Sequence, residues 1–211
     1  MLIQNCDSLT LNALKNILQA HGVDSDNWGK SPGTKPLESL LKEINSNECL
    51  LRSNRDGLVR GVSVASVIVK YNAGSKNLIL QESHAVWKDG RGTRKRTLHG
   101  SLSEKVQFGE PVQQAAARGL QEELGLCTSN EELQSRLRLQ QVSFEDGDSP
   151  SYPGLYSVIL NTIFTLRLKE GEFVSTGYRE DGPDKTTYFV WDEDLKSPFF
   201  LQNHSPEGLA H

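Results

Sequence analysis

Apolar residues recur at helical spacing twice within the first sixty positions of the chain. The first set is Leu11, Leu14, Ile17 and Leu18, and the second is Leu37, Leu40, Leu41 and Ile44. Residues three and four apart share one face of a helix. Ser8 and Thr10 are candidate caps of the first helix, and Pro36 suits the first turn of the second. Because glycines punctuate residues 21–33, we expect two short amphipathic helices joined by an ordered loop.

From Gly61 onward the pattern changes to strands. The candidate strands are residues 62–71, 77–81, 156–168 and 186–191, which are rich in β-branched residues or alternate between apolar and polar positions. One strongly helical segment, 112–124, interrupts this series, and 131–139 is a weaker helix candidate. This mixture predicts a fold of the α/β or α+β class, with helices packed on a central sheet.

The length of 211 residues fits one sizeable domain, or one domain with a short extension. We therefore expect a helical N-terminal extension over residues 1–60 and the main domain over residues 61–211. No internal repeat or low-complexity stretch is present in the sequence. The apolar faces of the two N-terminal helices need cover, so we expect them to pack on the main domain or on a second chain.

Composition and charge exclude several classes of protein. The chain is 36% hydrophobic and 24% charged, which is typical of globular proteins. A net charge of -4 argues against a protein that wraps long nucleic acid through a general basic field. Three widely separated cysteines favour a reducing compartment over a disulfide framework and lack zinc-ligand spacing. Without an apolar run of about 20 residues, we expect no membrane span and a cytoplasmic location.

The segment that carries chemistry is the helix predicted over residues 112–124. Each helical residue advances by about 100°, so positions 119, 122 and 123 share one face. Glu122 and Glu123 therefore project together, and adjacent carboxylates suit a hard divalent cation such as Mg²⁺ or Mn²⁺. Glu110, just ahead of the helix, favours its N-terminal dipole, and Arg118 can pair with Glu122 or Glu110. Taken alone, a Glu-Glu pair is more often a solvated helix face.

The spacing of the surrounding residues resembles the Nudix box. Seven of the nine fixed positions of that box match, namely Glu110, Arg118, Leu120, Glu122, Glu123, Gly125 and Leu126. The resemblance implies a Nudix-type α/β/α sandwich with a central mixed sheet. It also implies a metal-dependent pyrophosphohydrolase that acts on a nucleoside diphosphate linked to another moiety. The implied metal ligands are Glu122, Glu123 and Glu110, and the implied catalytic residues are Glu122, Glu123, Glu104 and Arg118.

The sequence departs from the box at two positions. Glu104 stands at the opening glycine, and Gly119 stands where a glutamate follows the arginine. In many members of the family that glutamate is a metal ligand or the general base. Glycine inside a helix is less favourable than alanine by about 1 kcal/mol, which suggests that another group needs the space. We expect Glu104, or a carboxylate from a later loop, to enter the gap.

Two later segments are candidate sources of that carboxylate. Residues 144–154 are predicted to form an acidic loop that offers Glu145, Asp146 and Asp148, and residues 178–184 form a second candidate loop. If no carboxylate fills the gap, the chain is instead a catalytically weak or inactive module that binds a nucleotide, an RNA end or a protein partner.

Basic residues cluster just before the box. They are Lys88, Arg91, Arg94, Lys95 and Arg96, with His84 and Trp87 close by. Such cations can hold terminal phosphates or an RNA 5′ end, although a solvated hairpin tip has the same composition. We take Arg94, Arg96 and Lys105 as candidate substrate-binding residues. The expected partner is a nucleotide-type small molecule, with an RNA 5′ end and a homodimer as open alternatives.

Overall fold

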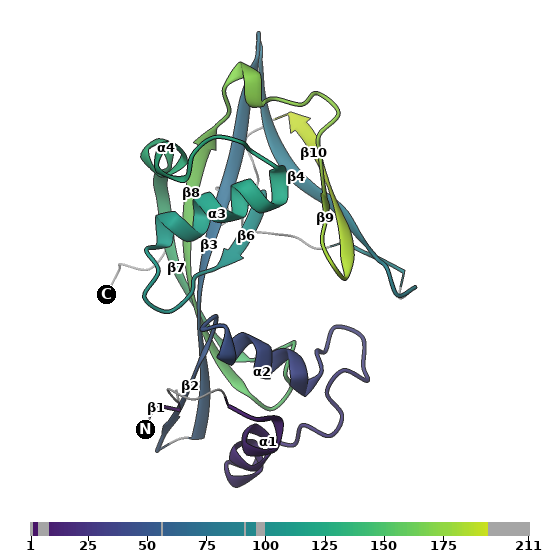
Figure 1. Ribbon diagram of the computed structural model, residues 1–211, viewed down its shortest axis with the longest axis vertical. Coiled ribbons are helices and arrows are strands. Elements are labelled where there is room, and N and C mark those ends of the chain that lie inside the picture. The colour runs from purple at the N-terminus through teal and green to yellow at the C-terminus, as the bar shows by residue number, and fades with distance from the viewer. Residues whose placement is uncertain (1, 4–8, 56, 91, 96–99, 194–211) are drawn as a thin grey trace, which may run out of the picture.

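The computed structural model describes residues 2–3, 9–55, 57–90, 92–95 and 100–193 (Figure 1). Its elements, in chain order, are β1 (Leu2–Ile3), α1 (Leu11–Ala20), α2 (Leu37–Asn45), β2 (Leu50–Asn54), β3 (Gly57–Ala73), β4 (Lys76–Trp87), β5 (Thr93–Arg94), β6 (Leu102–Lys105), α3 (Val112–Leu124), α4 (Asn130–Arg136), β7 (Arg138–Asp148), β8 (Tyr156–Arg167), the 3-10 turn η1 (Glu170–Glu172), β9 (Tyr178–Asp181) and β10 (Lys185–Glu193).

Both helices expected near the N-terminus are confirmed. The Thr10 hydroxyl accepts a hydrogen bond of 3.3 Å from the Ala13 N–H and so caps α1. The other cap candidate, Ser8, lies outside the described residues. Helix α2 follows Pro36. The apolar positions that predicted the helices are their buried face, with Leu14, Leu18 and Leu40 fully inaccessible to solvent.

Helix α3 spans the residues expected from the sequence. It begins after Pro111 and ends at Gly125, whose φ of 63° is a left-handed conformation that favours glycine. Small and aliphatic side chains cover its inner face, because Ala115, Ala116, Ala117 and Leu120 are all fully buried. The weaker helix candidate forms α4 but ends at Arg136, and Arg138 already opens strand β7.

The long strand β3 organises a mixed sheet. Along one edge it pairs with β8 in parallel, from Val59 opposite Tyr156 to Lys70 opposite Arg167. Along the other edge it pairs in succession with β2, β6 and β4, each antiparallel. Strand β4 then diverges from β3 and pairs with β10, which pairs with β9. This architecture is of the α+β class and is consistent with a Nudix-type fold.

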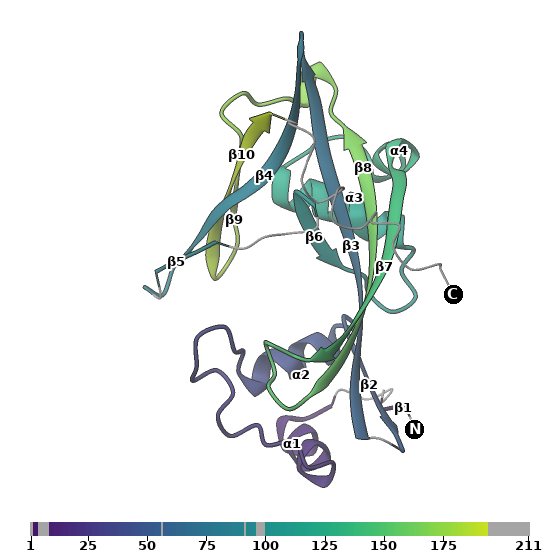
Figure 2. The same cartoon turned by 180° about the vertical axis from the view of Figure 1, so that it is seen from behind.

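Helices α3 and α4 cover one face of the β3–β8 ladder at one end, and α1 and α2 cover the opposite face at the other end (Figures 1 and 2). Successive strand residues point to opposite faces. Ala65, Val67 and Val69 belong to one core with α3 and α4, whereas Leu58 and Val62 belong to a second core with α1 and α2. The segment that connects β7 to β8 completes this second core.

Three parts of the chain differ from expectation, and one of them is residues 178–181, expected in a loop, which form strand β9. Residues 50–54 and 57–60, expected within the helical extension, form β2 and the first part of β3, so the extension shares the sheet of the rest of the chain. Residues 144–148, expected in an acidic loop, are the end of β7 and pair with β8. Backbone hydrogen bonds to β8 stabilise the extended conformation of these residues, although several of them are of turn-forming types.

In the part of the chain that the structure describes, no helix is long and apolar enough to cross a membrane. Cys49 is buried and Cys127 is exposed, and both are free thiols. Cys6 lies outside the described residues.

Candidate functional site

Arg118 joins the carboxylates at the candidate site. Its Nη1 lies 2.8 Å from Glu104 Oε1 and 3.8 Å from Glu122 Oε2. Its Nε and Nη2 donate to the two oxygens of Glu110 at 3.3 and 3.1 Å. Nη2 also donates to the backbone carbonyl of Lys105 at 3.0 Å. The guanidinium thus fixes β6, the loop after it and the middle of α3 relative to one another.

Glu104 fills the space beside Gly119. A Cβ atom built on Gly119 would lie 3.0 Å from the Glu104 Cβ and 3.3 Å from the Leu102 Cδ1. Glu104 pairs with Ala65 of β3, which places it on the side of the sheet that α3 covers. The absence of a side chain at position 119 is therefore what allows the Glu104 stem to lie against the helix.

The site holds two neighbouring carboxylates in different environments. The Glu104 side chain is 23% exposed and that of Glu122 is 58% exposed. Burial raises the pKa of Glu104, and the charge of Glu122 acts in the same direction, whereas Arg118 opposes both. Burial disfavours the charge on Arg118, but its hydrogen bonds to Glu110 and Glu104 raise its pKa above the usual value. The guanidinium is therefore a permanent cation in the site.

Glu110 has partners other than a metal. Arg118 engages both of its oxygens, and the Gln107 N–H donates to Oε2 at 3.0 Å. Its side chain is only 9% exposed. In this arrangement Glu110 closes the loop before α3 and orients Arg118, although the sequence indicated a metal ligand.

The residues around Gly119 fit a cation that takes few protein ligands. Glu122 and Glu123 lie one helical turn beyond Gly119, on the same side as Glu104, and Glu123 is half-buried. Within the described ranges, no group of three or more His, Cys, Asp or Glu side chains is arranged to hold a metal ion. An all-protein cage is thus absent from this part of the chain. Mg²⁺, however, commonly takes one or two carboxylates and fills its shell with water and phosphate oxygens.

Of the three candidate substrate-binding cations, the side chains of the two that the structure describes, Lys105 and Arg94, do not converge on this site. The Lys105 ammonium lies 2.8 Å from Glu43 and 2.8 Å from Glu48. Arg94 is exposed on β5, which lies at the end of β4 away from α3 (Figure 2). Arg96 lies outside the described residues.

The three later acidic candidates all lie on β7. Glu145, Asp146 and Asp148 pair with the first residues of β8, and Asp146 accepts a hydrogen bond from the Tyr156 hydroxyl. The Glu104 side chain, in contrast, lies directly against α3. Of the sources considered for the missing carboxylate, Glu104 is the one whose contact with Gly119 the structure shows.

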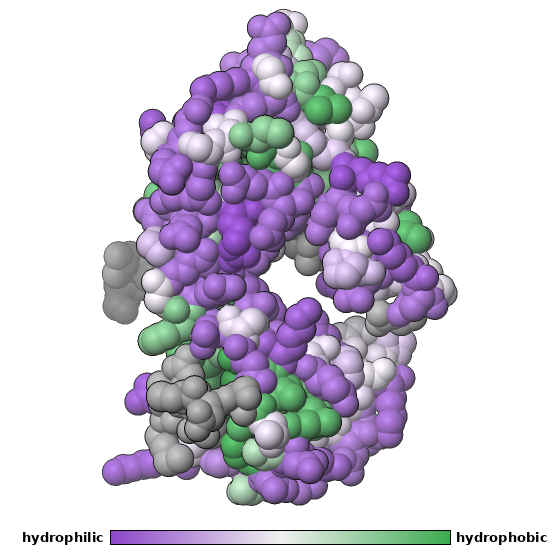
Figure 3. All heavy atoms as spheres, in the orientation of Figure 1, coloured by the Kyte–Doolittle hydropathy of each residue, from purple (hydrophilic) through white to green (hydrophobic). Residues whose placement is uncertain are grey.

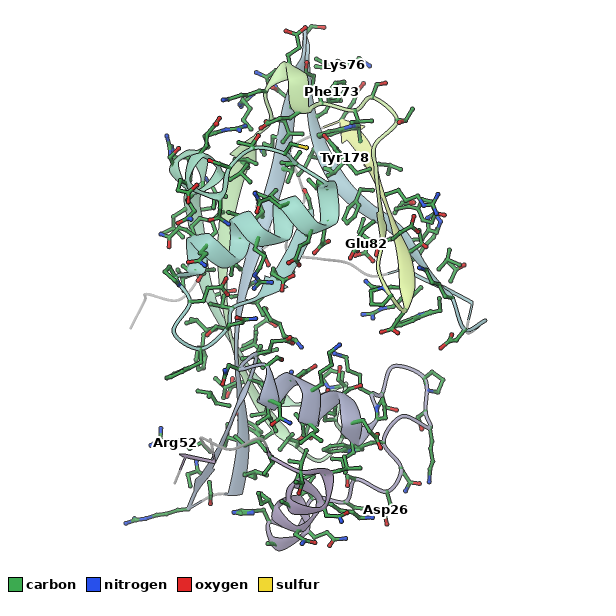
Figure 4. All side chains as sticks on the ribbon, in the orientation of Figure 1. Asp26, Arg52, Lys76, Glu82, Phe173 and Tyr178 are labelled. Atoms are coloured by element: carbon green, nitrogen blue, oxygen red, sulfur yellow. The ribbon has the colours of Figure 1, made fainter. Side chains whose placement is uncertain are left out.

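One carboxylate on this side of the sheet was not expected from the sequence. Glu82 of β4 pairs with Phe189 of β10, whose ring belongs to the α3 core, so Glu82 is on the face that carries α3 (Figure 4). Its side chain is half-buried. Figure 3 shows the surface hollowed between this upper part of the molecule and the part built by α1 and α2. No pattern around Glu82 in the sequence marks it, because its neighbours come from distant strands.

No family model matches the sequence. Comparison with curated proteins also finds no match.

The chain is similar in structure to several solved proteins, at low identity. Ap4A hydrolase from C. elegans is 15% identical, with a TM-score of 0.33 over 63% of this chain and 80% of that one. The Francisella tularensis bifunctional NMN adenylyltransferase/ADP ribose pyrophosphatase, complexed with AMP and Mn, is 16% identical, with a TM-score of 0.39 over 67% of this chain and 36% of that one. The T. brucei MERS1 protein is 10% identical, with a TM-score of 0.33 over 77% and 66%. Similarities at this level do not establish membership of a family.

Proposed function

We propose that this chain is a metal-dependent diphosphate hydrolase of the Nudix type, in which Glu104 takes the place of the missing box glutamate. The observation that carries the proposal is an exchange of residue types between two facing positions. The box has glycine at the first position and glutamate after its arginine, whereas this chain has Glu104 and Gly119. These two residues are in contact, since a Cβ at position 119 would lie 3.0 Å from that of Glu104. One of the two facing positions therefore still carries a carboxylate, and the other still has no side chain and leaves room for it.

Each residue of the site then has a role. Glu122 and Glu123 would hold a Mg²⁺ or Mn²⁺ ion, which when bound neutralises phosphate charge and activates water. Arg118 holds Glu104 Oε1, so Oε2 is the atom that would accept the proton of the attacking water. Glu110 orients Arg118 from the opposite side. Tying the catalytic carboxylate to α3 and β6 together reduces its freedom before substrate arrives.

The proposed substrate is a nucleoside diphosphate linked to another moiety. Water attacks one phosphorus atom, the bridging P–O bond breaks, and two phosphate monoesters leave. Arg94, on β5, would bind the substrate's phosphates only if β5 approaches the site in the complex. Arg96, which lies outside the described residues, stays a candidate phosphate ligand. Lys105 is engaged by Glu43 and Glu48, so its role is better assigned to the scaffold.

A second function is favoured by one observation. Arg118 already pairs with Glu104 and Glu110, and carboxylates engaged in this way are less available to a metal ion, which suits a module that binds a nucleotide or RNA end without turnover. The two functions differ in product formation, so a hydrolysis assay separates them.

The proposal is tested with a panel of ADP-ribose, dinucleoside polyphosphates, coenzyme A and capped RNA, assayed with Mg²⁺ and with Mn²⁺. We expect hydrolysis of at least one compound, and loss of that activity on chelation of the metal. Glu104→Gln should lower the rate by about 10²–10⁴-fold, as removal of a general base does. Glu131→Gln, at an exposed position of α4, is the matched control and should retain the wild-type rate. Absence of hydrolysis of every compound with both metals would reject the proposal.

A further inference from the structure

The turn that follows α2 is tied to the first loop of the box. The Lys105 ammonium lies 2.8 Å from Glu43 Oε1 on α2 and 2.8 Å from Glu48 Oε2 just after it. Between these two residues, the Asn47 carbonyl accepts a hydrogen bond of 2.8 Å from the Phe108 N–H. Three contacts thus connect α2 and the turn after it to Lys105 and Phe108, which follow Glu104 in the chain.

Glu104 and Lys105 are consecutive on β6 and point to opposite faces of the sheet. The Glu104 side chain lies against Gly119 of α3, and the Lys105 side chain reaches α2. The backbone carbonyl of Lys105 accepts a hydrogen bond from Arg118 Nη2. One residue of β6 is therefore bound to α2 through its side chain and to the candidate site through its backbone.

Glu43 is the buried end of this connection. Its side chain is 5% exposed, and it contacts Arg60 at 2.6 Å and Lys35 at 2.9 Å in addition to Lys105. Burial alone would raise its pKa, but these three cations lower it to about 2, so the carboxylate is charged at neutral pH. Arg60, itself 8% exposed, already supplies a buried counter-charge. Because Arg60 already neutralises the Glu43 charge, the contact of Glu43 with Lys105 serves another purpose, which is to fix the end of β6.

We propose that Glu43 is a positioning residue for the candidate active site. By holding the Lys105 ammonium, it sets the end of β6 so that the Lys105 carbonyl and the Glu104 carboxylate both meet Arg118. The kinetic consequence of this inference rests on the proposed function, whereas the structural consequence does not.

The structural consequence is tested by ¹⁵N NMR of the Arg118 Nε–H in the full chain. Lys105→Met keeps the aliphatic stem, removes the ammonium and leaves Glu43 paired with Arg60 and Lys35. We expect Lys105→Met and Glu43→Gln to shift the Arg118 Nε–H signal and to speed its exchange with water. Lys105→Arg and Glu38→Gln, the latter at an exposed position of α2, should leave the signal unchanged. An unchanged Arg118 signal in folded Lys105→Met would overturn the proposal, even if Glu43→Gln does not fold.

The kinetic consequence is tested with the compound that the wild-type chain hydrolyses. A misplaced catalytic group lowers the rate of the chemical step, so we expect kcat to fall by about 10- to 100-fold with little change in KM. Because Glu43 acts through Lys105, the double variant Glu43→Gln/Lys105→Met should be no slower than the slower single variant. Multiplying effects, or loss confined to KM, would contradict a positioning role. If no compound is hydrolysed, the proposed function fails and the NMR result alone decides the role of Glu43.

Discussion

Gly119 lowers the stability of helix α3 but leaves room for a side chain from another element. Glycine in a helix interior costs about 1 kcal/mol relative to alanine. Leu102 and Glu104 of β6 occupy the space that a Cβ would enter. The glycine is therefore explained by a contact between two elements, and the residue it accommodates is the carboxylate held by Arg118.

This explanation predicts the effect of Gly119→Ala. The methyl group gains about 1 kcal/mol of helix propensity but must displace the Glu104 stem, so we expect a net change in the free energy of unfolding of less than about 1 kcal/mol. The displaced carboxylate should nevertheless lower kcat for the hydrolysed compound. Urea unfolding and steady-state kinetics measure the two effects, with Gln114→Ala at an exposed position of α3 as control. Full activity in Gly119→Ala would show that the position of Glu104 does not matter.

The buried Glu43 predicts a pH dependence of stability. Its pKa is about 2 in the folded protein against 4.5 in the unfolded chain, so ionisation favours the folded state. The contribution is complete above about pH 4.5 and is lost as the pH falls toward about 2. The stability difference between the wild-type chain and Glu43→Gln should therefore be constant near neutrality and decrease below about pH 4.5. Chemical unfolding as a function of pH measures it, and a difference that grows on acidification would contradict the assignment.

The sequence predicted part of the site at the residue scale. The spacing within α3 predicted that Arg118 lies beside Glu122, and the two side chains are 3.8 Å apart. The two departures from the box pointed to Glu104, which contacts Arg118. The sequence could not place Lys105, because the partner carboxylates of this residue are supplied by α2 and the turn after it. Arg94 was grouped with the site through its nearness in sequence, but β4 carries it away from α3.

At the scale of elements, the helices followed from the sequence more closely than the strands did. Periodic apolar residues, together with Pro36, Pro111 and Gly125, determine where α1, α2 and α3 lie. Strand β7 was not predicted in any part, because its side chains are mostly exposed and carry no apolar–polar alternation. Its conformation is fixed instead by antiparallel pairing with β8, which is not visible in local sequence.

The packing of α2 predicts a large effect of truncating its inner face. Leu40 is fully buried in the core shared with β3, so Leu40→Ala should destabilise the chain by about 2–5 kcal/mol. Leu139→Ala, on β7, is the matched control because its residue is 60% exposed, and it should change stability by less than about 0.5 kcal/mol. Denaturant unfolding measures both. A small loss for Leu40→Ala would mean that α2 is not packed as described.

At the scale of the whole molecule, two cores share one ladder of strands. The boundary expected near residue 60 falls inside β3, which contributes to the core of α1 and α2 and to that of α3 and α4. Strand β6 connects both sides, because Glu104 faces one core and Lys105 faces the other. Helix α2 is thus joined to β6, and through β6 to the candidate site, by direct contacts.

The double variant Glu104→Gly/Gly119→Glu tests most directly the proposed exchange of Nudix-box residue types between positions 104 and 119. The measurement is kcat/KM with Mg²⁺ for the wild-type chain, the two single variants and the double variant, on a compound that the wild-type chain hydrolyses. Glu104→Gly removes the carboxylate, and Gly119→Glu crowds the one already present, so we predict that each single variant loses about 10²–10⁴-fold. The double variant carries its carboxylate at position 119 and has no side chain at position 104, so the contact again holds one carboxylate with room for it. We predict that it recovers most of the wild-type kcat/KM. A double variant as inactive as Glu104→Gly, with the fold intact, would contradict the exchange.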